Sequence, residues 1–357
     1  MEKIRVIQIG TGNWGFSWIE KVMQSPFAEL AAVVDANPDM LKIVAERYGL
    51  DEKICFQSLE QAVSRVQADA ALVIVPPALH KEVAVAALES GLHCLVEKPL
   101  AETMRDAVEI VEAAKKNGKK LMVSQNYRFK RAPQTVKTLI EKQYAGKIGS
   151  VFVNFQKAPQ FTGFRTKMPE PLIEDMSVHH FDQIRGILNL NPVRIRAHSW
   201  NTPWSWFEGN PVAAVLFEMD NGAVVSYNGN WVSRGWETTW DGEWRIQGSE
   251  GEILWKNNQV ILHPADLFVS VFQDGAVEKE GDLYFDLKPM KQEERLASIA
   301  EFAAAILEDR EPETSGADNL YSLAMVIGAK YAARTGEVVE VEDMLKPENY
   351  DRFSEQG

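Results

Sequence analysis

A glycine-rich loop directly after the first strand-like run constrains the fold of this chain more than any other feature. The β-branched run Ile4–Ile9 leads into Gly-Thr-Gly-Asn-Trp-Gly at residues 10–15, and an apolar helical stretch, Phe16–Met23, follows. In such a unit the first glycine permits a tight turn, the second lets a phosphate approach the backbone, and the third permits close helix–strand packing. The free N–H groups at the start of the helix suit the phosphates of a dinucleotide.

An acidic residue at the end of the second strand-like run supports the same interpretation. The run Leu30–Val34 ends in Asp35, 20 residues after Gly15, where a carboxylate would accept hydrogen bonds from both hydroxyls of an adenosine ribose. It would also repel the 2′-phosphate of NADP, so we expect NAD as cofactor in preference to NADP. The alternative is that Asp35 is only a turn residue. The residues expected to bind the cofactor here are Gly10, Thr11, Gly12, Asn13, Trp14, Gly15 and Asp35.

The first third of the chain alternates short β-branched runs with amphipathic stretches that end at Gly49, Gly91 and Gly118. This alternation is typical of βαβ units on a parallel sheet, and each glycine is expected to end a helix in the left-handed conformation. A doubly wound α/β domain is therefore predicted over residues 1–125. Its strands are expected at Ile4–Ile9, Leu30–Val34, Ala70–Val75, His93–Val96 and Lys120–Val123, with further helices at Asp39–Tyr48, Lys81–Ser90 and Met104–Asn117.

The second part of the chain predicts an α+β domain over residues 126–345, followed by a charged, frayed tail at 346–357. Its best hairpin signal is Val212–Met219 and Ala223–Trp231, joined by a segment in which Asn221 and Gly222 can form a type I′ turn. A meander of strands is expected to continue at Glu243–Gln247, Glu252–Trp255, Gln259–Leu262 and Leu267–Phe272. Helices are expected at Pro133–Lys142, Asp175–Ile187, Gln292–Glu308 and Ala317–Arg334.

Charge and composition exclude several classes of function. The 357 residues suffice for about two domains, and 38 Lys and Arg against 51 Asp and Glu give a net charge of −13. So acidic a chain repels phosphate backbones and anionic lipids, and we expect neither nucleic acid nor membrane as a partner. Two cysteines cannot form a disulfide framework, and no signal peptide is visible, so a cytoplasmic location is expected.

Two clusters carry candidate chemistry. Lys98 follows the run His93–Val96, at the carboxyl edge of the predicted sheet, where Pro99 fixes the chain direction beside the expected nicotinamide; the alternative is a surface lysine. Asp175, His179 and Asp182 would share one face of a helix and make a tunable base. By itself that segment is better explained as an acidic helix start followed by a core histidine.

Neither histidine nor tryptophan content adds a firm site. The chain has six histidines without a His-x-x-x-His or Cys-x-x-Cys pair, so we expect no metal site. Of the ten tryptophans, most are expected in the core or at a subunit interface. Because aromatic faces suit the C–H faces of sugars, Trp204–Trp206 and Trp236–Trp240 are candidates for the substrate side.

The order of the motifs resembles the glucose-fructose oxidoreductase / inositol dehydrogenase / rhizopine-catabolism (Gfo/Idh/MocA) family over Ile4 to about Glu340. The motifs that carry the resemblance are the glycine loop, Asp35, Pro76 with His80, Glu97-Lys98-Pro99, Gln125-Asn126-Tyr127-Arg128 and Asp175-x-x-x-His179-x-x-Asp182. It implies a Rossmann domain and a second domain with a large, mostly antiparallel open sheet, often used for subunit association, so a homodimer or homotetramer is expected.

The resemblance also implies site residues. Lys98, Asp175 and His179 are expected to face the substrate carbon, and Pro76, His80, Glu97, Lys98 and Gln125 to contact the cofactor. His80 by itself is better explained as a helix-start residue. Arg128 is expected to contact the substrate, as is Arg165 or Lys167 from the loop Phe161–Pro171. Pro77 and Ser177 depart from the asparagine and glycine that are frequent in the family.

The expected activity is NAD-dependent oxidation of a secondary alcohol on a sugar, inositol or related polyol. His179 would take the hydroxyl proton, Asp175 would orient the imidazole, and Lys98 would stabilise the developing alkoxide. Two alternatives stay open. One is a glycoside-cleaving or epimerising enzyme in which tightly bound NAD returns its hydride. The other is a non-catalytic NAD or sugar sensor, which would need neither Lys98 nor His179.

Overall fold

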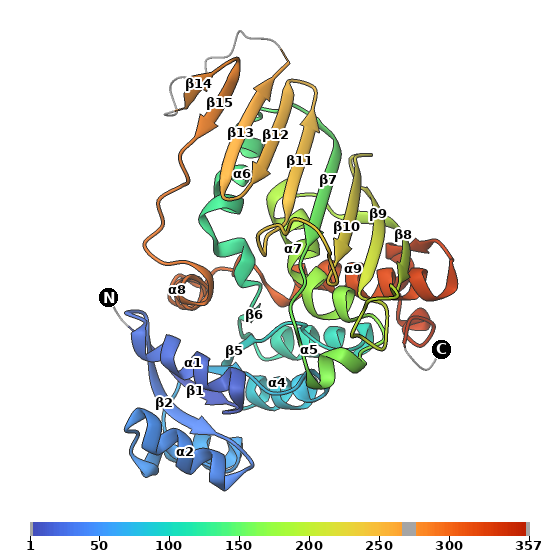
Figure 1. Cartoon of the computed structure of the whole chain (residues 1–357). Helices are drawn as coiled ribbons and strands as arrows, with labels where there is room; N and C mark the ends of the chain where they lie inside the picture. The colour runs from blue at the N-terminus through green and yellow to red at the C-terminus, as the bar shows by residue number, and fades with distance from the viewer. Residues whose placement is uncertain (1–2, 266–275, 355–357) are drawn as a thin grey trace. The chain divides into compact units, whose positions relative to one another are not determined.

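The structure is a computed structural model that describes residues 3–265 and 276–354 (Figure 1). Its contacts divide the chain into two compact units: Met1–Phe129 with Gln292–Leu323, and Lys130–Lys291 with Ala324–Gly357. The expected contiguous second domain, 126–345, is therefore wrong for residues 292–323, which group with the N-terminal part. The expected strand at Leu267–Phe272 lies outside the described residues.

The first unit contains a six-stranded parallel sheet in the order β3-β2-β1-β4-β5-β6, the order of a dinucleotide-binding doubly wound fold. The strands are β1 (Ile4–Ile9), β2 (Ala28–Val34), β3 (Cys55–Phe56), β4 (Ala70–Val73), β5 (His93–Val96) and β6 (Leu121–Val123). The helices are α1 (Asn13–Gln24), α2 (Pro38–Tyr48), α3 (Leu59–Arg65), α4 (His80–Glu89), α5 (Met104–Lys116) and α8 (Glu294–Leu307). The fold class is confirmed, and β3 and α3 are additions to the predicted elements.

Local sequence explains these elements. The central strands are buried along their length, as expected when helices cover both faces of a parallel sheet. Thr103 accepts from the backbone N–H of Asp106 and so caps α5. Gly49, Gly91 and Gly118 have φ values of 63°, 84° and 60°, which confirms the predicted left-handed helix ends.

The second unit contains a ten-stranded, mostly antiparallel sheet in the order β14-β15-β13-β12-β11-β7-β10-β9-β8-β16, within which β7 and β10 are parallel. Its strands are β7 (Ile148–Gln156), β8 (Pro192–Trp200), β9 (Val212–Met219), β10 (Val224–Asn230), β11 (Glu243–Gly248), β12 (Gly251–Lys256), β13 (Gln259–Pro264), β14 (Val277–Lys279), β15 (Asp282–Phe285) and β16 (Val339–Glu340). Its helices are α6 (Arg131–Glu141), α7 (Val178–Leu188) and α10 (Val341–Met344), and α9 (Gly316–Thr335) contains the boundary between the units.

One face of this sheet carries the core. Helix α6 packs on β12 and β13 (Figure 1). Helix α10 packs on β8. The opposite face keeps large apolar side chains about two-fifths exposed, among them Phe152 at 46%, Leu216 at 42% and Val224 at 41%. The unit therefore presents an open, partly apolar sheet face.

Two predicted details of this unit are wrong. The hairpin of β9 and β10 forms, but positive φ falls on Gly222 and not on Asn221, and the Gly222 N–H donates to the Met219 carbonyl. This is a three-residue loop ending in a left-handed glycine, in place of a type I′ turn. The predicted frayed tail is packed as far as residue 354, because the Phe353 ring lies edge-on to Tyr331 of α9 with centroids 5.0 Å apart.

Candidate dinucleotide site and catalytic residues

The glycine loop is sterically determined at its two ends and open in its middle. A Cβ on Gly10, whose φ is 97°, would lie 2.1 Å from the Ile74 carbonyl oxygen, and a Cβ on Gly15 would lie 2.5 Å from the Gly10 oxygen. A Cβ on Gly12 would meet no heavy atom of the described residues within 4 Å. The first and third glycines are thus required by packing, while the second borders open space.

That open space lies at the N-terminus of α1. Gly12 is the N-cap residue, and the first helical turn contains no acidic residue. Within the part of the chain that the structure describes, no side chain caps the helix. The first backbone N–H groups therefore have no side-chain acceptor, and the helix dipole favours an anion there. A diphosphate fits this donor set, so residues of the loop can hold a dinucleotide.

Gln8 anchors the loop and was missed by the sequence analysis. This fully buried side chain of β1 donates from Nε2 to the carbonyl oxygens of Gly10, at 3.0 Å, and Gly15, at 2.9 Å. The available signal was a glutamine between two isoleucines, Ile7 and Ile9, near the end of the strand.

Asp35 is also tied to the loop. Its Oδ2 accepts from the backbone N–H of Thr11 at 2.8 Å and from Thr11 Oγ1 at 2.7 Å, and its Oδ1 accepts from the Asn37 N–H at 2.9 Å. A carboxylate has about four acceptor positions. These contacts leave roughly one for a ribose hydroxyl, so Asp35 both positions the loop and keeps acceptor capacity at the end of β2.

The carboxyl edge of the sheet holds His80 and Gln125. Both ring nitrogens of buried His80 lie against backbone carbonyls, Nδ1 at 2.8 Å from Pro99 and Nε2 at 2.9 Å from Val75, and burial lowers its pKa. These contacts are structural and agree with its assignment as a helix-start residue. Among residues 3–265 and 276–354, neither amide atom of buried Gln125 has a hydrogen-bond partner. Such an unsatisfied amide is costly, and it follows β6 at the ligand-binding edge.

Arg128 has a partner that the sequence did not indicate. The guanidinium is buried and donates from Nη2 to Asp318 Oδ2 at 3.0 Å, at the start of α9. Its expected contact with substrate has to compete with this ion pair. Lys98 is half-buried directly after β5.

In the second unit, the segment that carries Asp175 and His179 is not one regular α-helix. A π-helix, η5 (Leu172–Ser177), contains Asp175 and leads into α7, where His179 is 9% exposed. π-Helical turns are rare in proteins overall, and those that occur are often found at functional sites. The predicted helix at Asp175–Ile187 is corrected at its first turn, which is wider than an α turn.

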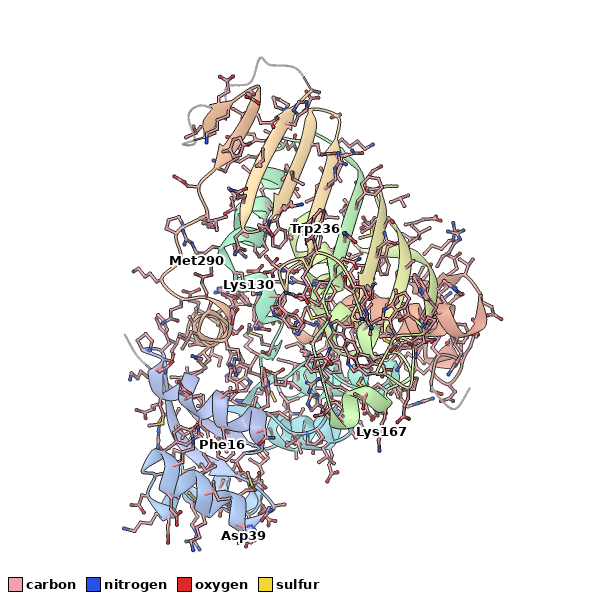
Figure 2. All side chains as sticks on the ribbon, viewed as in Figure 1. Phe16, Asp39, Lys130, Lys167, Trp236 and Met290 are labelled. Carbon is pink, nitrogen blue, oxygen red and sulfur yellow. The ribbon has the colours of Figure 1, made fainter. Side chains whose placement is uncertain are left out.

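Asp175 is paired with the loop that precedes it. Arg165 Nε lies 2.5 Å from Asp175 Oδ2, and the guanidinium carbon lies 5.2 Å from the Phe161 ring centroid and 4.7 Å from that of Phe164. Arg165 is thereby held beside a predicted catalytic carboxylate. Lys167 of the same loop is exposed (Figure 2).

A buried polar chain lies next to His179. Ser177 Oγ lies 3.0 Å from the Tyr227 hydroxyl, which lies 3.0 Å from His180 Nδ1, and His180 Nε2 lies 2.9 Å from the Trp240 carbonyl oxygen. Burial lowers the pKa of His180 to about 4, so the ring is neutral and donates from Nε2 to Trp240. Burial also raises the pKa of Tyr227. Ser177, where the family often has glycine, thus fastens η5 to β10.

The tryptophan candidates separate by exposure. Trp18, Trp231, Trp244 and Trp255 are buried in the core, whereas the other six tryptophans are at least partly exposed. Trp204 donates to the Val232 carbonyl at 2.9 Å, and Trp236, on the loop after β10, is 98% exposed (Figure 2). Among the residues described, no group of three His, Cys, Asp or Glu could hold a metal ion, and no helix is long and apolar enough to cross a membrane.

Comparison with known proteins gives matches along most of the chain. Residues 4–125 match a model described as an oxidoreductase family with an NAD-binding Rossmann fold, and residues 134–254 match the GFO/IDH/MocA C-terminal domain. The chain is 26% identical over 344 residues to 1,5-anhydro-D-fructose reductase of Ensifer adhaerens, covering 94% of this chain and 98% of that one. It is 30% identical over 186 residues to inositol 2-dehydrogenase of Pseudarthrobacter chlorophenolicus, covering 52% and 54%.

The fold also has solved counterparts. An oxidoreductase from Agrobacterium radiobacter, crystallised with NAD+, L-tartaric acid and magnesium, superposes with a TM-score of 0.84 at 21% identity, covering 96% of this chain and 100% of that one. At this level of identity the match establishes the fold of the chain.

Proposed function

Since the chain belongs to the GFO/IDH/MocA family of oxidoreductases with an NAD-binding Rossmann fold, we propose that it oxidises a secondary alcohol of a sugar, inositol or related polyol with NAD. The observation that carries the proposal is the open, uncapped start of α1 beside Gly12. The names of the relatives, a reductase of an anhydrosugar and an inositol dehydrogenase, support the substrate class.

The preference for NAD rests on Asp35. Its carboxylate lies at the end of β2, and its remaining acceptor position suits a ribose hydroxyl. The negative charge of the same carboxylate would repel a 2′-phosphate. NAD, when bound, would supply the hydride acceptor. The loop residues Gly10 to Gly15 would hold its diphosphate through backbone N–H groups.

Lys98, Asp175 and His179 are the proposed catalytic residues. His179 would accept the hydroxyl proton as general base, and Lys98 would donate a hydrogen bond to the same oxygen as negative charge develops. Asp175 would orient and charge-balance the imidazole. Because Arg165 is paired with Asp175, we further propose that Arg165 sets how much of that negative charge His179 experiences.

The open face of the second sheet supports a homo-oligomer. Phe152, Leu216 and Val224 are exposed on that face and define a strip in which Ser226 separates Phe152 from Leu216. Burying these side chains against a second copy would remove this surface from water. We propose a homodimer, or a tetramer built from such dimers.

The assay that tests the activity follows reduced nicotinamide by absorbance with NAD or NADP and a panel of inositols, aldoses and anhydrosugars. Sustained reduction of NAD with one alcohol is the expected result. A flat trace with every alcohol and both cofactors would contradict net dehydrogenase activity.

A further inference from the structure

The carboxylate of Glu97, which precedes Lys98, receives three N–H groups. Its Oε1 accepts from the indole Nε1 of Trp14 at 3.0 Å and from that of Trp18 at 2.7 Å. Its Oε2 accepts from the backbone N–H of Lys98 at 3.0 Å. Glu97 is only 7% exposed, so these donors replace water around a nearly buried carboxylate.

The two indoles come from the segment predicted to bind diphosphate. Trp14 stands between Gly12 and Gly15 of the loop, and Trp18 lies one turn further along α1. One carboxylate oxygen therefore holds the first turns of α1, while the other holds the peptide from which Lys98 extends.

A cation completes the cluster. The guanidinium carbon of Arg295, in the first turn of α8, lies 4.6 Å from the Trp14 ring centroid and 5.7 Å from that of Trp18. Its Nη1 donates to Ser17 Oγ at 2.6 Å. Cations on indole faces are attracted to the ring, and this one also opposes the charge of Glu97. The carboxylate is thus compensated without a direct ion pair.

We propose that Glu97 is a positioning residue that fixes the Lys98 backbone to the diphosphate-binding turn of α1 through the Trp14 and Trp18 indoles. The cluster then holds both the loop that would bind the dinucleotide and the backbone from which the Lys98 side chain extends. A displacement of about 1 Å at a reacting group can cost on the order of 100-fold in rate, which gives this contact its importance. The part that concerns Lys98 rests on the function proposed above.

The decisive variants are Glu97→Gln and Trp14→Phe. Glutamine has the same size, but its NH2 group must face one of the three N–H donors, so at least one hydrogen bond is lost. Phenylalanine keeps a ring under Arg295 and removes one donor, and since Trp14 is 54% exposed the variant is expected to fold. The matched control is Glu29→Gln, which changes an exposed carboxylate on β2 in the same way.

Three readouts are needed. Indole N–H signals of the ten tryptophans, observed by ¹⁵N NMR, report the contacts; calorimetry gives the Kd for NAD; and steady-state kinetics separate kcat from KM for the alcohol. In Glu97→Gln we expect the Trp14 and Trp18 signals to move, the Kd to rise about fivefold, and kcat to fall about 100-fold with KM little changed. Trp14→Phe is expected to raise the Kd for NAD and to lower kcat as well, each by a smaller factor than Glu97→Gln.

Unmoved signals of Trp14 and Trp18 in Glu97→Gln, or a Kd and kcat equal to those of the Glu29→Gln control, would overturn the proposal. If Glu97→Gln does not fold, Trp14→Phe decides by the shift of the Trp18 indole signal, the Kd for NAD and kcat. If the protein oxidises no alcohol at all, the proposed dehydrogenase activity fails, while the indole signals and the Kd for NAD still decide whether Glu97 organises the cofactor loop.

Discussion

At the scale of single residues, His179 and Lys98 carry the proposed proton transfer and oxyanion stabilisation. We expect His179→Ala and Lys98→Met each to lower kcat by about 10²–10⁴-fold and to leave the Kd for NAD nearly unchanged. Steady-state kinetics and calorimetry check this, with the exposed Lys53→Met as control. A parallel loss of NAD affinity in both variants would show that these residues bind cofactor and would contradict their catalytic assignment.

Asp35 and Thr11 separate cofactor preference from loop anchoring. Asp35→Ser removes the charge that repels a 2′-phosphate, so we expect the ratio of NADP to NAD affinity to rise about tenfold or more. Thr11→Val removes the Oγ1 donor to Asp35 and keeps the charge, so it should weaken both cofactors alike. Calorimetry with each cofactor measures both Kd values. An unchanged ratio in Asp35→Ser would remove the basis for the NAD preference.

The role of a single residue could be predicted from the sequence where the backbone conformation at that position allows only one residue type. Gly10 and Gly15 were predictable because a Cβ there meets backbone atoms. The double role of Gln8 and the ion pair of Arg128 with Asp318 were not, because their partners are chosen by the folded backbone. The link of Glu97 to Trp14 likewise joins residues 83 positions apart.

At the scale of elements, the His180 network ties η5 and α7 to the sheet and predicts a pH dependence of stability. The pKa of His180 falls from 6.5 to about 4 on folding. The unfolded chain therefore binds the proton more readily, and stability from this group is complete above pH 6.5 and is lost as pH falls toward 4. The loss is about 3 kcal/mol over that window.

Denaturant unfolding between pH 4 and pH 7 measures this effect. His180→Gln can still donate to the Trp240 carbonyl and accept from Tyr227, but it cannot titrate. We expect the variant to lose less stability than the natural protein on acidification, by about 3 kcal/mol. Equal losses in both proteins would mean that the ring is not buried in its neutral form.

Elements with strong local signals were predictable, and others were not. The runs Ile4–Ile9 and His93–Val96 match β1 and β5 at both ends, because apolar strands end where polar or glycine residues begin. The two-residue β3 has too short a pattern to detect. Long β7 alternates buried and exposed residues, but its outer face includes Phe152 as well as Asn154, which blurs the period of two.

At the scale of the whole molecule, grouping of residues 292–323 with the N-terminal unit depends on long-range contacts. Helix α8 packs on α1, and Ser315 forms a bridge with Met122 of β6. The amino-acid composition does not change where the chain re-enters the N-terminal unit at residue 292. A contiguous second domain was therefore the natural expectation from the sequence.

The open sheet face predicts assembly. Phe152→Glu places a charge on the face that carries Leu216 and Val224. We expect this variant to shift the protein from dimer or tetramer toward monomer in sedimentation velocity. Val338→Glu, outside this strip, is the control. A natural protein that sediments as a monomer at micromolar concentration would contradict the proposed assembly.

Hydride transfer itself is the central claim, and a quenched reaction with polyols deuterated on their carbinol carbons tests it most directly. The protein is mixed with equimolar NAD and each polyol in turn, quenched within milliseconds to seconds, and the nicotinamide is analysed by mass spectrometry. We predict deuterium in the nicotinamide with at least one polyol, even if the label later returns to product. Absence of deuterium with every sugar and polyol, in protein that binds NAD, would contradict the account.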